Sequence, residues 1–202
     1  MRVLVACEFS GAVRSAFRRL GHDAWSCDLL PSEDSGPHIQ CDVRDVLMSG
    51  WDMMIAHPPC THLASSGARH FHRKKREQRQ ALEFVQELLD APIQFIALEN
   101  PVGVISTAIR KPDQIIQPYQ FGHPESKKTC LWLQNLPLLE ASEVLPERPR
   151  WENQTPSGQN RLPPSADRWK KRSITYEGIA AAMASQWGAH AAGLLAKNPS
   201  NN

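Results

Sequence analysis

Short apolar runs alternate with amphipathic stretches along most of this chain. Four runs have the length and composition of buried strands, at residues 2–7, 23–29, 51–56 and 93–98. Residues 12–20 and 73–89 carry apolar side chains at helical spacing. In the first of these helices, Phe17 belongs to the apolar face and Arg14 to the polar face. The alternation of strands and helices predicts an α/β fold built on a mostly parallel sheet.

The second half of the chain continues this pattern and then loses it. Residues 102–109 are predicted as a short helix, and residues 115–121 and 129–133 as two further strands forming an antiparallel edge. Residues 137–172 are rich in proline and show no periodicity, so we interpret them as an irregular insertion. Residues 173–196 are rich in alanine and are predicted as a closing helix.

Length and composition predict one domain over residues 1–202, because 41% hydrophobic residues suffice for an ordinary core. The formal net charge of +2 gives no argument for a polyanionic partner. The five cysteines are scattered and never form a CxxC pair, so we expect neither a disulfide framework nor a metal site, and a cytoplasmic location. No apolar run approaches the ~20 residues of a membrane helix, and no membrane association is expected.

Polar residues follow the predicted strands at the edge where ligands bind in such sheets. The turn Phe9-Ser10-Gly11 leads into a helix and could hold an anionic group. Asp28 lies about 20 residues further on, where a carboxylate can bind ribose hydroxyls. The alternative is a capped turn with a surface aspartate, because the turn has one glycine where a dinucleotide fingerprint has three.

Pro58 and Pro59 stiffen the chain after a buried strand and present Cys60 on a rigid loop. A lone cysteine is usually an inert small hydrophobe. At the end of a strand, however, Cys60 is well placed to act as a nucleophile. Glu99 ends the next apolar strand, where burial is expected to raise its pKa and make it a proton donor.

These motifs resemble those of the cytosine-C5 DNA methyltransferases, which use S-adenosylmethionine. The nucleophile loop of that family, Pro-Pro-Cys followed by Ser and Gly, is matched at residues 58–60, 65 and 67. Its Glu-Asn-Val motif is matched by Glu99-Asn100, with Pro101 in place of Val, and a later Phe-Gly by residues 121–122. The resemblance covers residues 2–133 and resumes at 173. It implies a Rossmann-like class I methyltransferase fold, with helices on both faces of the sheet and an antiparallel edge strand.

The resemblance also implies a mechanism and a set of roles. Cys60 would add to C6 of cytosine while Glu99 engages N3 and the exocyclic amine, and C5 would take the methyl group. In a DNA duplex the target base must first be flipped out of the stack. The remaining roles are divided between cofactor and substrate: Phe9, Ser10, Gly11, Asp28 (ribose), Asp42 (adenine amine) and Pro58 for the cofactor; Ser65, Asn100, Lys127 and Lys128 for the substrate.

The chain also departs from that family's pattern. Its first glycine-rich motif keeps only Phe9 and Gly11, and Lys127-Lys128 stand where the family has arginines, which alone offer a bidentate fork. The final motif, at Gly178, lacks its asparagine. Target recognition could come only from residues 137–172, a reduced form of the family's recognition domain. A form this compact would suit a phage or another mobile element.

A run of cations follows the nucleophile loop and includes Arg69 and Arg73. We expect both to contact phosphate, with a solvated helix face as the alternative. Trp151, Trp169 and Trp187 could stack on bases or pin loops to the core.

Three functions remain open from the sequence. The first is methylation of cytosine C5 in DNA. The second applies the same chemistry to a cytosine nucleotide or to single-stranded DNA, because little protein remains to hold a duplex. The third is a nucleic-acid-binding protein without catalysis, which the degraded glycine motif favours and the retained Cys60 and Glu99 oppose.

Overall fold

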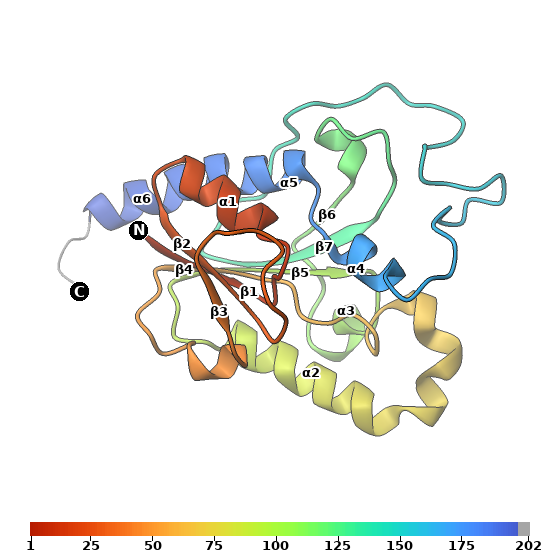
Figure 1. Ribbon diagram of the computed structural model, residues 1–202, viewed down its shortest axis with the longest axis horizontal. Helices are drawn as coiled ribbons and strands as arrows, with labels where there is room; N and C mark the ends of the chain where they lie inside the picture. The colour runs from red at the N-terminus through yellow and green to blue at the C-terminus, as the bar shows by residue number, and fades with distance from the viewer. Residues whose placement is uncertain (198–202) are drawn as a thin grey trace.

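The computed structural model describes residues 1–197, except for the side chains of residues 69 and 70, and it is organised around one seven-stranded sheet (Figure 1). The strand order is β3-β2-β1-β4-β5-β7-β6. The strands are β1 (Arg2–Ala6), β2 (Asp23–Asp28), β3 (His38–Gln40), β4 (Met53–Ala56), β5 (Phe95–Pro101), β6 (Gln114–Ile116) and β7 (Thr129–Gln134).

The first five strands run parallel, and the last two complete the sheet in antiparallel pairing. β1 pairs with β2 on one side and with β4 on the other, and β4 pairs with β5. β7 runs antiparallel to both β5 and the edge strand β6. This mostly parallel sheet with an antiparallel edge is the Rossmann-like class I fold, and it confirms the predicted fold class.

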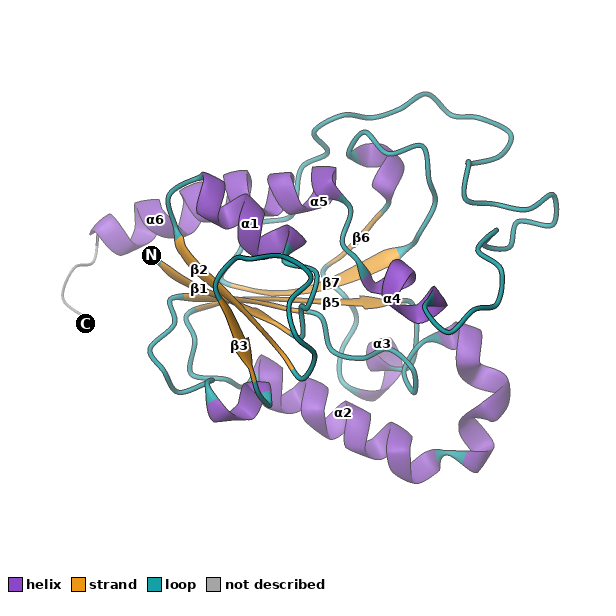
Figure 2. Cartoon of the chain, in the orientation of Figure 1, coloured by secondary structure: helices purple, strands orange, loops and turns teal. Residues whose placement is uncertain are grey.

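Helices cover both faces of the sheet (Figure 2). On one face lie α1 (Ala12–Arg19), α5 (Glu177–Ala182) and α6 (Gly188–Lys197), the last two joined by a π-helical turn at Met183–Trp187. On the other face lie α2 (Lys75–Leu89) and the short α3 (Ile105–Ala108). Successive strand residues alternate between the two cores: Val3 and Val5 pack under the first layer, and Leu4 and Ala6 under the second. The alternation follows from the period of two of a strand.

Several predicted boundaries are wrong. The strand β3 forms between the predicted strands at 23–29 and 51–56, where no strand was predicted, because Ser26–Asp28 of β2 offer it a free edge. The long helix begins at Lys75 and not at residue 73, after a 3-10 helix at Ser65–Arg73. A short helix, α4 (Arg168–Ser173), lies inside the stretch predicted as irregular, and the closing helix starts at Glu177.

Arg14 also departs from its predicted place on the polar face of α1. Its side chain is fully buried, because the β2–β3 loop folds over it. Its guanidinium pairs with Asp34 of that loop and donates to Ser26 Oγ at 2.8 Å and to the Pro37 carbonyl at 3.3 Å. A buried charge requires partners of this kind.

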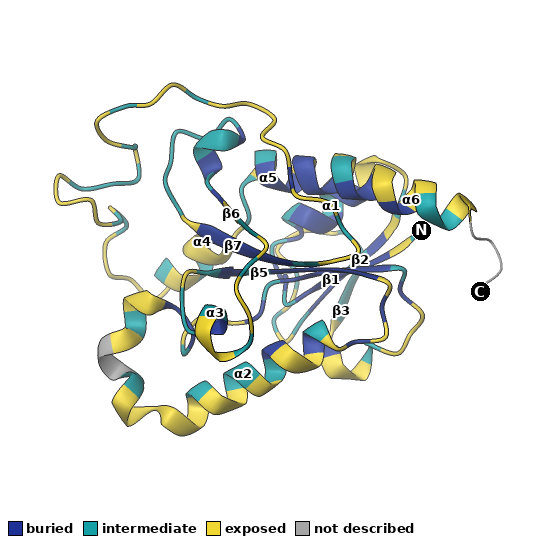
Figure 3. Cartoon of the chain, turned by 180° about the vertical axis from the view of Figure 1, so that it is seen from behind, coloured by how far each residue is buried: buried dark blue, intermediate teal, exposed yellow. Residues whose placement is uncertain are grey.

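Residues 135–167 contain neither helix nor strand and arch away from the sheet as a largely exposed loop (Figure 3). The loop is held against the β6–β7 connection. Trp151 stacks on Tyr119 with ring centroids 4.3 Å apart, and Asn153 exchanges two hydrogen bonds with the backbone of Ser126. Trp187 is buried and donates to the Pro137 carbonyl at 2.9 Å. Trp151 and Trp187 therefore pin the loop. No helix in residues 1–197 is long and apolar enough to cross a membrane.

Candidate active site

The turn after β1 is organised by a buried carboxylate. Cys7 adopts a left-handed conformation (φ 58°), and this turns the chain so that Glu8 points beneath the first turn of α1. The Glu8 carboxylate accepts hydrogen bonds from the backbone N–H groups of Val13 at 2.7 Å and Arg14 at 3.2 Å. Burial raises the pKa of Glu8, while the neighbouring His57 and these N–H donors oppose the rise. The amino end of α1 is therefore satisfied by the chain's own carboxylate.

Asp28 and Asp42 lie on the same edge of the sheet, close to Cys7. Burial raises the pKa of the Cys7 thiol, and the negative charges of Asp28 and Asp42 raise it further. Asp28 accepts one hydrogen bond, from the Leu30 N–H at 2.9 Å. Asp42 caps a 3-10 helix at Val43–Asp45 and binds both the N–H and the guanidinium of Arg44. Asp28 keeps more free acceptor capacity than Asp42.

Hydrogen bonds from neighbouring strands fix the loop that carries Cys60. The His57 N–H donates to the Ala6 carbonyl at 2.9 Å, which ties the start of the loop to β1. Asn100 Nδ2 donates to the Pro58 carbonyl at 2.8 Å, which ties its middle to β5. The N–H groups of Leu63 and Ala64 both donate to the Cys60 carbonyl. Cys60 is thus an exposed residue on a loop tied to both neighbouring strands, and its role as a nucleophile stays a prediction.

Glu99 is partly buried, with 15% of its side chain exposed, but the predicted rise in its pKa is wrong. Burial does raise the pKa, yet the hydrogen bond from His57, the charge of Lys127 and the hydroxyl of Thr129 outweigh it, so the pKa falls below its usual value. His57 Nδ1 lies 3.2 Å from Glu99 Oε2. These partners come from other strands and loops, so the sequence around Glu99 does not reveal them, whereas the cost of burial follows from the apolar strand alone. Glu99 is therefore stabilised as a carboxylate.

The Cys60 thiol has opposing neighbours. Burial raises its pKa, and the charge of Glu99 raises it further, whereas Lys127 and Arg172 lower it. The thiolate is the nucleophilic form. On balance the pKa of Cys60 stays above its usual value, so Lys127 and Arg172 offset only part of the effects that favour the thiol.

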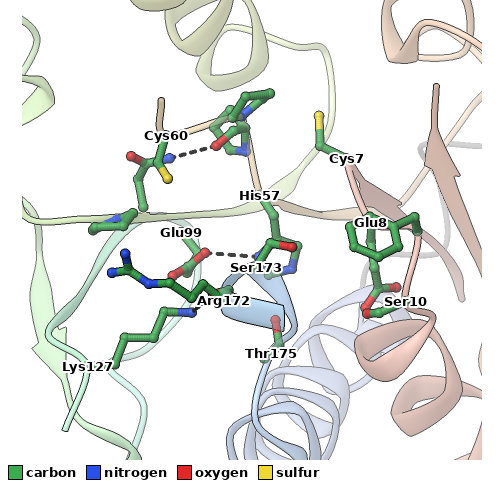
Figure 4. A pocket seen from close by; sticks show the side chains of 15 residues that line it. Cys7, Glu8, Ser10, His57, Cys60, Glu99, Lys127, Arg172, Ser173 and Thr175 are labelled. Atoms are coloured by element: carbon green, nitrogen blue, oxygen red, sulfur yellow. Dashed lines mark hydrogen bonds and ion pairs between the residues drawn. The ribbon is translucent and has the colours of Figure 1, made fainter. Parts of the chain in front are cut away.

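One cavity brings these groups together (Figure 4). Cys60 and Glu99 lie on one side of it and Glu8 and Ser10 on the other, with His57 between them. Its volume is about 90 Å³, well below the ~300–1,000 Å³ of typical small-molecule sites. The cavity is small because α4 and the residues after it cover it, contributing Arg172, Ser173 and Thr175 to its wall.

Two contacts hold α4 over the cavity. The Trp169 ring meets the Phe9 ring edge-on, with centroids 6.0 Å apart. Lys127 Nζ donates to the Arg172 carbonyl at 2.9 Å. Trp169 therefore links α4 to the turn after β1, and half of its surface stays exposed.

A much larger groove, of about 1,200 Å³, adjoins the cavity and shares Pro101, Lys127, Arg172 and Thr175 with it. One wall comes from the loop at residues 152–163 and from α4, and the other from the nucleophile loop and the β6–β7 connection. Five cations line it, against Glu125 and Glu152: Lys127, Lys128, Arg161, Lys171 and Arg172. Glu125 is engaged by the Tyr176 hydroxyl. The groove is therefore predominantly cationic.

The predicted site residues fall into three groups. Seven line the small cavity: Phe9, Ser10, Pro58, Cys60, Glu99, Asn100 and Lys127. Ser65 and Lys128 line the groove instead. Gly11, Asp28, Asp42 and Arg73 line neither, and the side chain of Arg69 lies outside the described residues. Arg73 is exposed on a 3-10 helix and donates to His72 Nε2 at 3.1 Å, and its contact with phosphate stays a prediction.

Eight residues that line the cavity were not predicted as site residues: Cys7, Glu8, His57, Pro59, Pro101, Arg172, Ser173 and Thr175. Glu8 and His57 could have been found, because each directly follows a buried strand at the edge that the site occupies. Arg172 and Thr175 carried no such signal, since they come from a segment whose placement the sequence left open. Within the described residues, no three His, Cys, Asp or Glu side chains are grouped as metal ligands would be.

The chain resembles known proteins in structure and not in sequence. No protein-family model matches the chain, and no curated protein sequence matches it. Among solved structures, it is similar to one described as a DNA modification methyltransferase encoded within a prophage (E. coli), with 15% identity over 66% of this chain and a TM-score of 0.44. It is also similar to a mutant of DNMT2 from Spodoptera frugiperda, with 14% identity over 74% of this chain and a TM-score of 0.44. The chain spans about half the length of these two structures, covering 46% and 55% of them.

Proposed function

We propose that this protein is an S-adenosylmethionine-dependent methyltransferase that methylates cytosine in DNA at C5. The observation that supports this most is that Cys60 and Glu99 face one cavity together with the turn Phe9–Ser10. A nucleophile, a carboxyl group and a turn between strand and helix meet at the carboxyl edge of a parallel sheet, where such folds bind ligands. The sequence motifs supply the same residues in the same order.

The donor set of this edge suits the cofactor. S-adenosylmethionine carries a cationic amino-acid part and ribose hydroxyls, and carboxylates bind both. Glu8 lines the cavity, and Asp28 has acceptor capacity left, because a carboxylate has about four lone-pair sites. His57 lines the same cavity, and its Nε2 is buried with no hydrogen-bond partner among the residues that the structure describes. We propose that Phe9, Ser10, Glu8 and Asp28 hold the cofactor, which when bound supplies an electrophilic methyl group.

The protein's own residues would activate the target cytosine for methylation. Lys127 and Arg172 favour the thiolate of Cys60, which would form a bond to C6 of cytosine. Glu99 would bind N3 and the exocyclic amine, so that the electron pair released by the addition makes C5 nucleophilic. C5 would then take the methyl group that the bound cofactor supplies. Water would accept the C5 proton, and the electron pair of the broken C5–H bond would return to the ring and expel Cys60 as thiolate. Asn100 keeps the Cys60 loop in register with Glu99 by binding the Pro58 carbonyl.

The cationic groove favours a polynucleotide over a free nucleotide as substrate. Its volume of about 1,200 Å³ exceeds that of most small-molecule sites, and it opens directly into the cavity. Five cations are suited to a phosphate backbone, while Val102, Ile115 and Ile174 add apolar surface for bases. We propose that residues 137–172 serve as a reduced substrate-recognition segment. Because the cavity itself holds only about 90 Å³, residues 168–175 would have to shift when ligands bind.

The test uses the purified chain, methyl-labelled cofactor and unmethylated DNA. We expect label in 5-methylcytosine after hydrolysis of the DNA, and a loss of at least ~100-fold in Cys60→Ser. Cys41→Ser is the matched control, because Cys41 does not line the cavity. Label that persists in Cys60→Ser, or that appears on another base, would contradict the mechanism.

Two further measurements separate the alternatives. Initial rates on duplex DNA, a single strand of the same sequence and free cytidine nucleotides rank the substrates, and we expect both polynucleotides to exceed the nucleotides. Calorimetry with S-adenosylmethionine tests the non-catalytic alternative. Absence of heat at millimolar cofactor, together with retained DNA binding, would favour a binding protein without catalysis.

A further inference from the structure

His57 is held rigidly at the end of β4 and has its ring inside the candidate site. Its side chain is 8% exposed, and its backbone N–H is bound to the Ala6 carbonyl. Nδ1 lies 3.2 Å from Oε2 of Glu99. An ionised carboxylate only accepts hydrogen bonds, so Nδ1 carries the proton in this contact. The contact therefore fixes both the ring orientation and the tautomer.

The other ring nitrogen, Nε2, is buried and has no hydrogen-bond partner among the described residues. The ring lies between Glu99 and Glu8, the two carboxyl groups of the cavity (Figure 4). The charged and titratable groups that surround it come from five segments: Cys7 and Glu8 after β1, Cys60 after β4, Glu99 on β5, Lys127 before β7 and Arg172 on α4. An imidazole with one nitrogen bound to a carboxylate and the other free can take up and release a proton.

The proposed function creates a need for such a group. Glu99 must donate a proton to N3 of cytosine, yet His57, Lys127 and Thr129 lower its pKa and favour the carboxylate. A carboxyl group that is ionised at neutral pH is a poor acid when it acts alone. A second group next to Glu99 is therefore needed to hold the proton. His57 is the titratable group in hydrogen-bond contact with that carboxyl.

We propose that His57 is a positioning residue that holds a proton for Glu99, so that the His57–Glu99 pair, and not Glu99 alone, supplies the proton taken up at N3 of the target base. This inference rests on the proposed function. His57 orients Glu99 through Oε2 and leaves Oε1 to face the base. Glu99 remains the residue that touches the substrate.

The proton balance is as follows. In the active state the pair carries one proton beyond the Nδ1–H of His57, either on Nε2 as imidazolium or on Oε1 of Glu99. As Cys60 bonds to C6, the Oε1–H bond breaks and the N3–H bond forms. Glu99 is left as a carboxylate that still accepts the Nδ1–H bond. When Cys60 leaves as thiolate at the end of the reaction, the N3–H bond breaks and the proton returns to Oε1 of Glu99. The pair thus regains its proton before the next turnover, and no oxidant or reductant is involved.

The kinetic test compares the pH dependence of kcat for wild type and His57→Gln. Without His57, the proton must reside on Glu99 alone, and reference pKa values of carboxyl groups lie about two units below that of imidazole. We expect kcat at neutral pH to fall by at least ~10-fold, KM to stay within ~3-fold, and the alkaline limb to move to lower pH by ~1–2 units, so that acid partly restores the rate. His62→Gln, outside the cavity, is the control. If kcat of His57→Gln were reduced by the same factor at every pH, His57 would have a purely structural role, and the proposal would be overturned.

A second measurement does not depend on catalysis. The ¹⁵N shifts of the His57 ring report protonation of each nitrogen, and titration of wild type and Glu99→Gln follows the pair directly. We expect Nδ1 to stay protonated in wild type while Nε2 titrates, and the midpoint to fall in Glu99→Gln because the carboxylate partner is gone. An unchanged midpoint would overturn the shared proton. Failure of the wild type to methylate cytosine would instead refute the proposed function, and the ring titration would still decide the pairing.

Discussion

Asn100 Nδ2 donates a hydrogen bond to the backbone carbonyl of Pro58 at 2.8 Å, and this contact joins the ends of β5 and β4. Asn100 is almost fully buried, and its Oδ1 finds no partner in the described part of the chain. The residue predicted to touch substrate therefore has a structural task. It fixes the distance between the strand that carries Glu99 and the loop that carries Cys60.

Replacing Asn100 with alanine should weaken both the fold and the site. The substitution leaves the Pro58 carbonyl buried without a donor, which costs about 1–3 kcal/mol of unfolding free energy. It also frees the Cys60 loop, so methyl transfer should fall more than stability alone explains. Urea unfolding and single-turnover rates measure the two effects. The control Gln94→Ala changes an exposed residue beside β5, and its unfolding free energy should stay within ~0.5 kcal/mol of wild type. Equal stability of the two variants would contradict the structural role of Asn100.

Glu8 predicts a specific dependence of stability on pH. Burial raises its folded-state pKa above the ordinary value of 4.5, so the folded protein retains a proton that the unfolded chain has lost. Stability linked to Glu8 is therefore complete below pH 4.5 and declines as pH rises through the raised pKa. Glu8→Gln removes this titration and should flatten the curve of unfolding free energy above pH 4.5. Glu33→Gln, on the exposed β2–β3 loop, should leave the curve unchanged. A slope retained in Glu8→Gln would exclude Glu8 as its source.

The strands that carry the site could be predicted because each one is a run of consecutive apolar residues, which is visible in the sequence without knowledge of the fold. Each apolar run had to be buried, and the residues after Ala6, Ala56 and Leu98 then had to meet at one edge of a parallel sheet. This reasoning brought Cys60 and Glu99 together. The strand β3 could not be predicted in this way, because a strand of three residues is too short to show a hydrophobic pattern.

Contacts between distant segments could not be predicted. The pKa of Glu99 depends on His57 and Lys127, which lie 42 and 28 positions away along the chain. Arg14 looked like a solvated helix residue because the sequence does not show that residues 31–37 fold over it. The placement of α4 over the cavity likewise depends on Trp169 meeting Phe9, a contact between opposite ends of the chain.

The cationic groove predicts a strong dependence of DNA affinity on salt. Each phosphate contact changes the slope of log K against log salt concentration by about 0.9 for duplex DNA. Lys128→Met and Lys171→Met should each reduce affinity at low salt and lower the slope by about that amount, because both side chains line the groove. Fluorescence anisotropy with a labelled duplex at several salt concentrations measures both quantities.

The matched control is Arg19→Met, which removes an exposed cation at the end of α1, outside the groove. It should leave the slope unchanged within error, although it alters net charge by the same amount. If all three variants shift the slope equally, binding follows net charge and the groove has no special part in it.

Asp34→Ala should destabilise the fold because it removes the carboxylate partner of the buried Arg14 guanidinium. The Arg14 guanidinium is fully buried, and Asp34 is the carboxylate that pairs with it, while Ser26 and Pro37 supply neutral acceptors. Without Asp34 the charge stays buried with fewer partners, which should cost about 1.5–3 kcal/mol. Asp45→Ala, an exposed change at the end of the 3-10 helix Val43–Asp45, should cost less than ~0.5 kcal/mol. Urea unfolding of the two variants measures this difference. Similar unfolding midpoints would show that solvent or the neutral acceptors already meet the hydrogen-bonding needs of the Arg14 guanidinium.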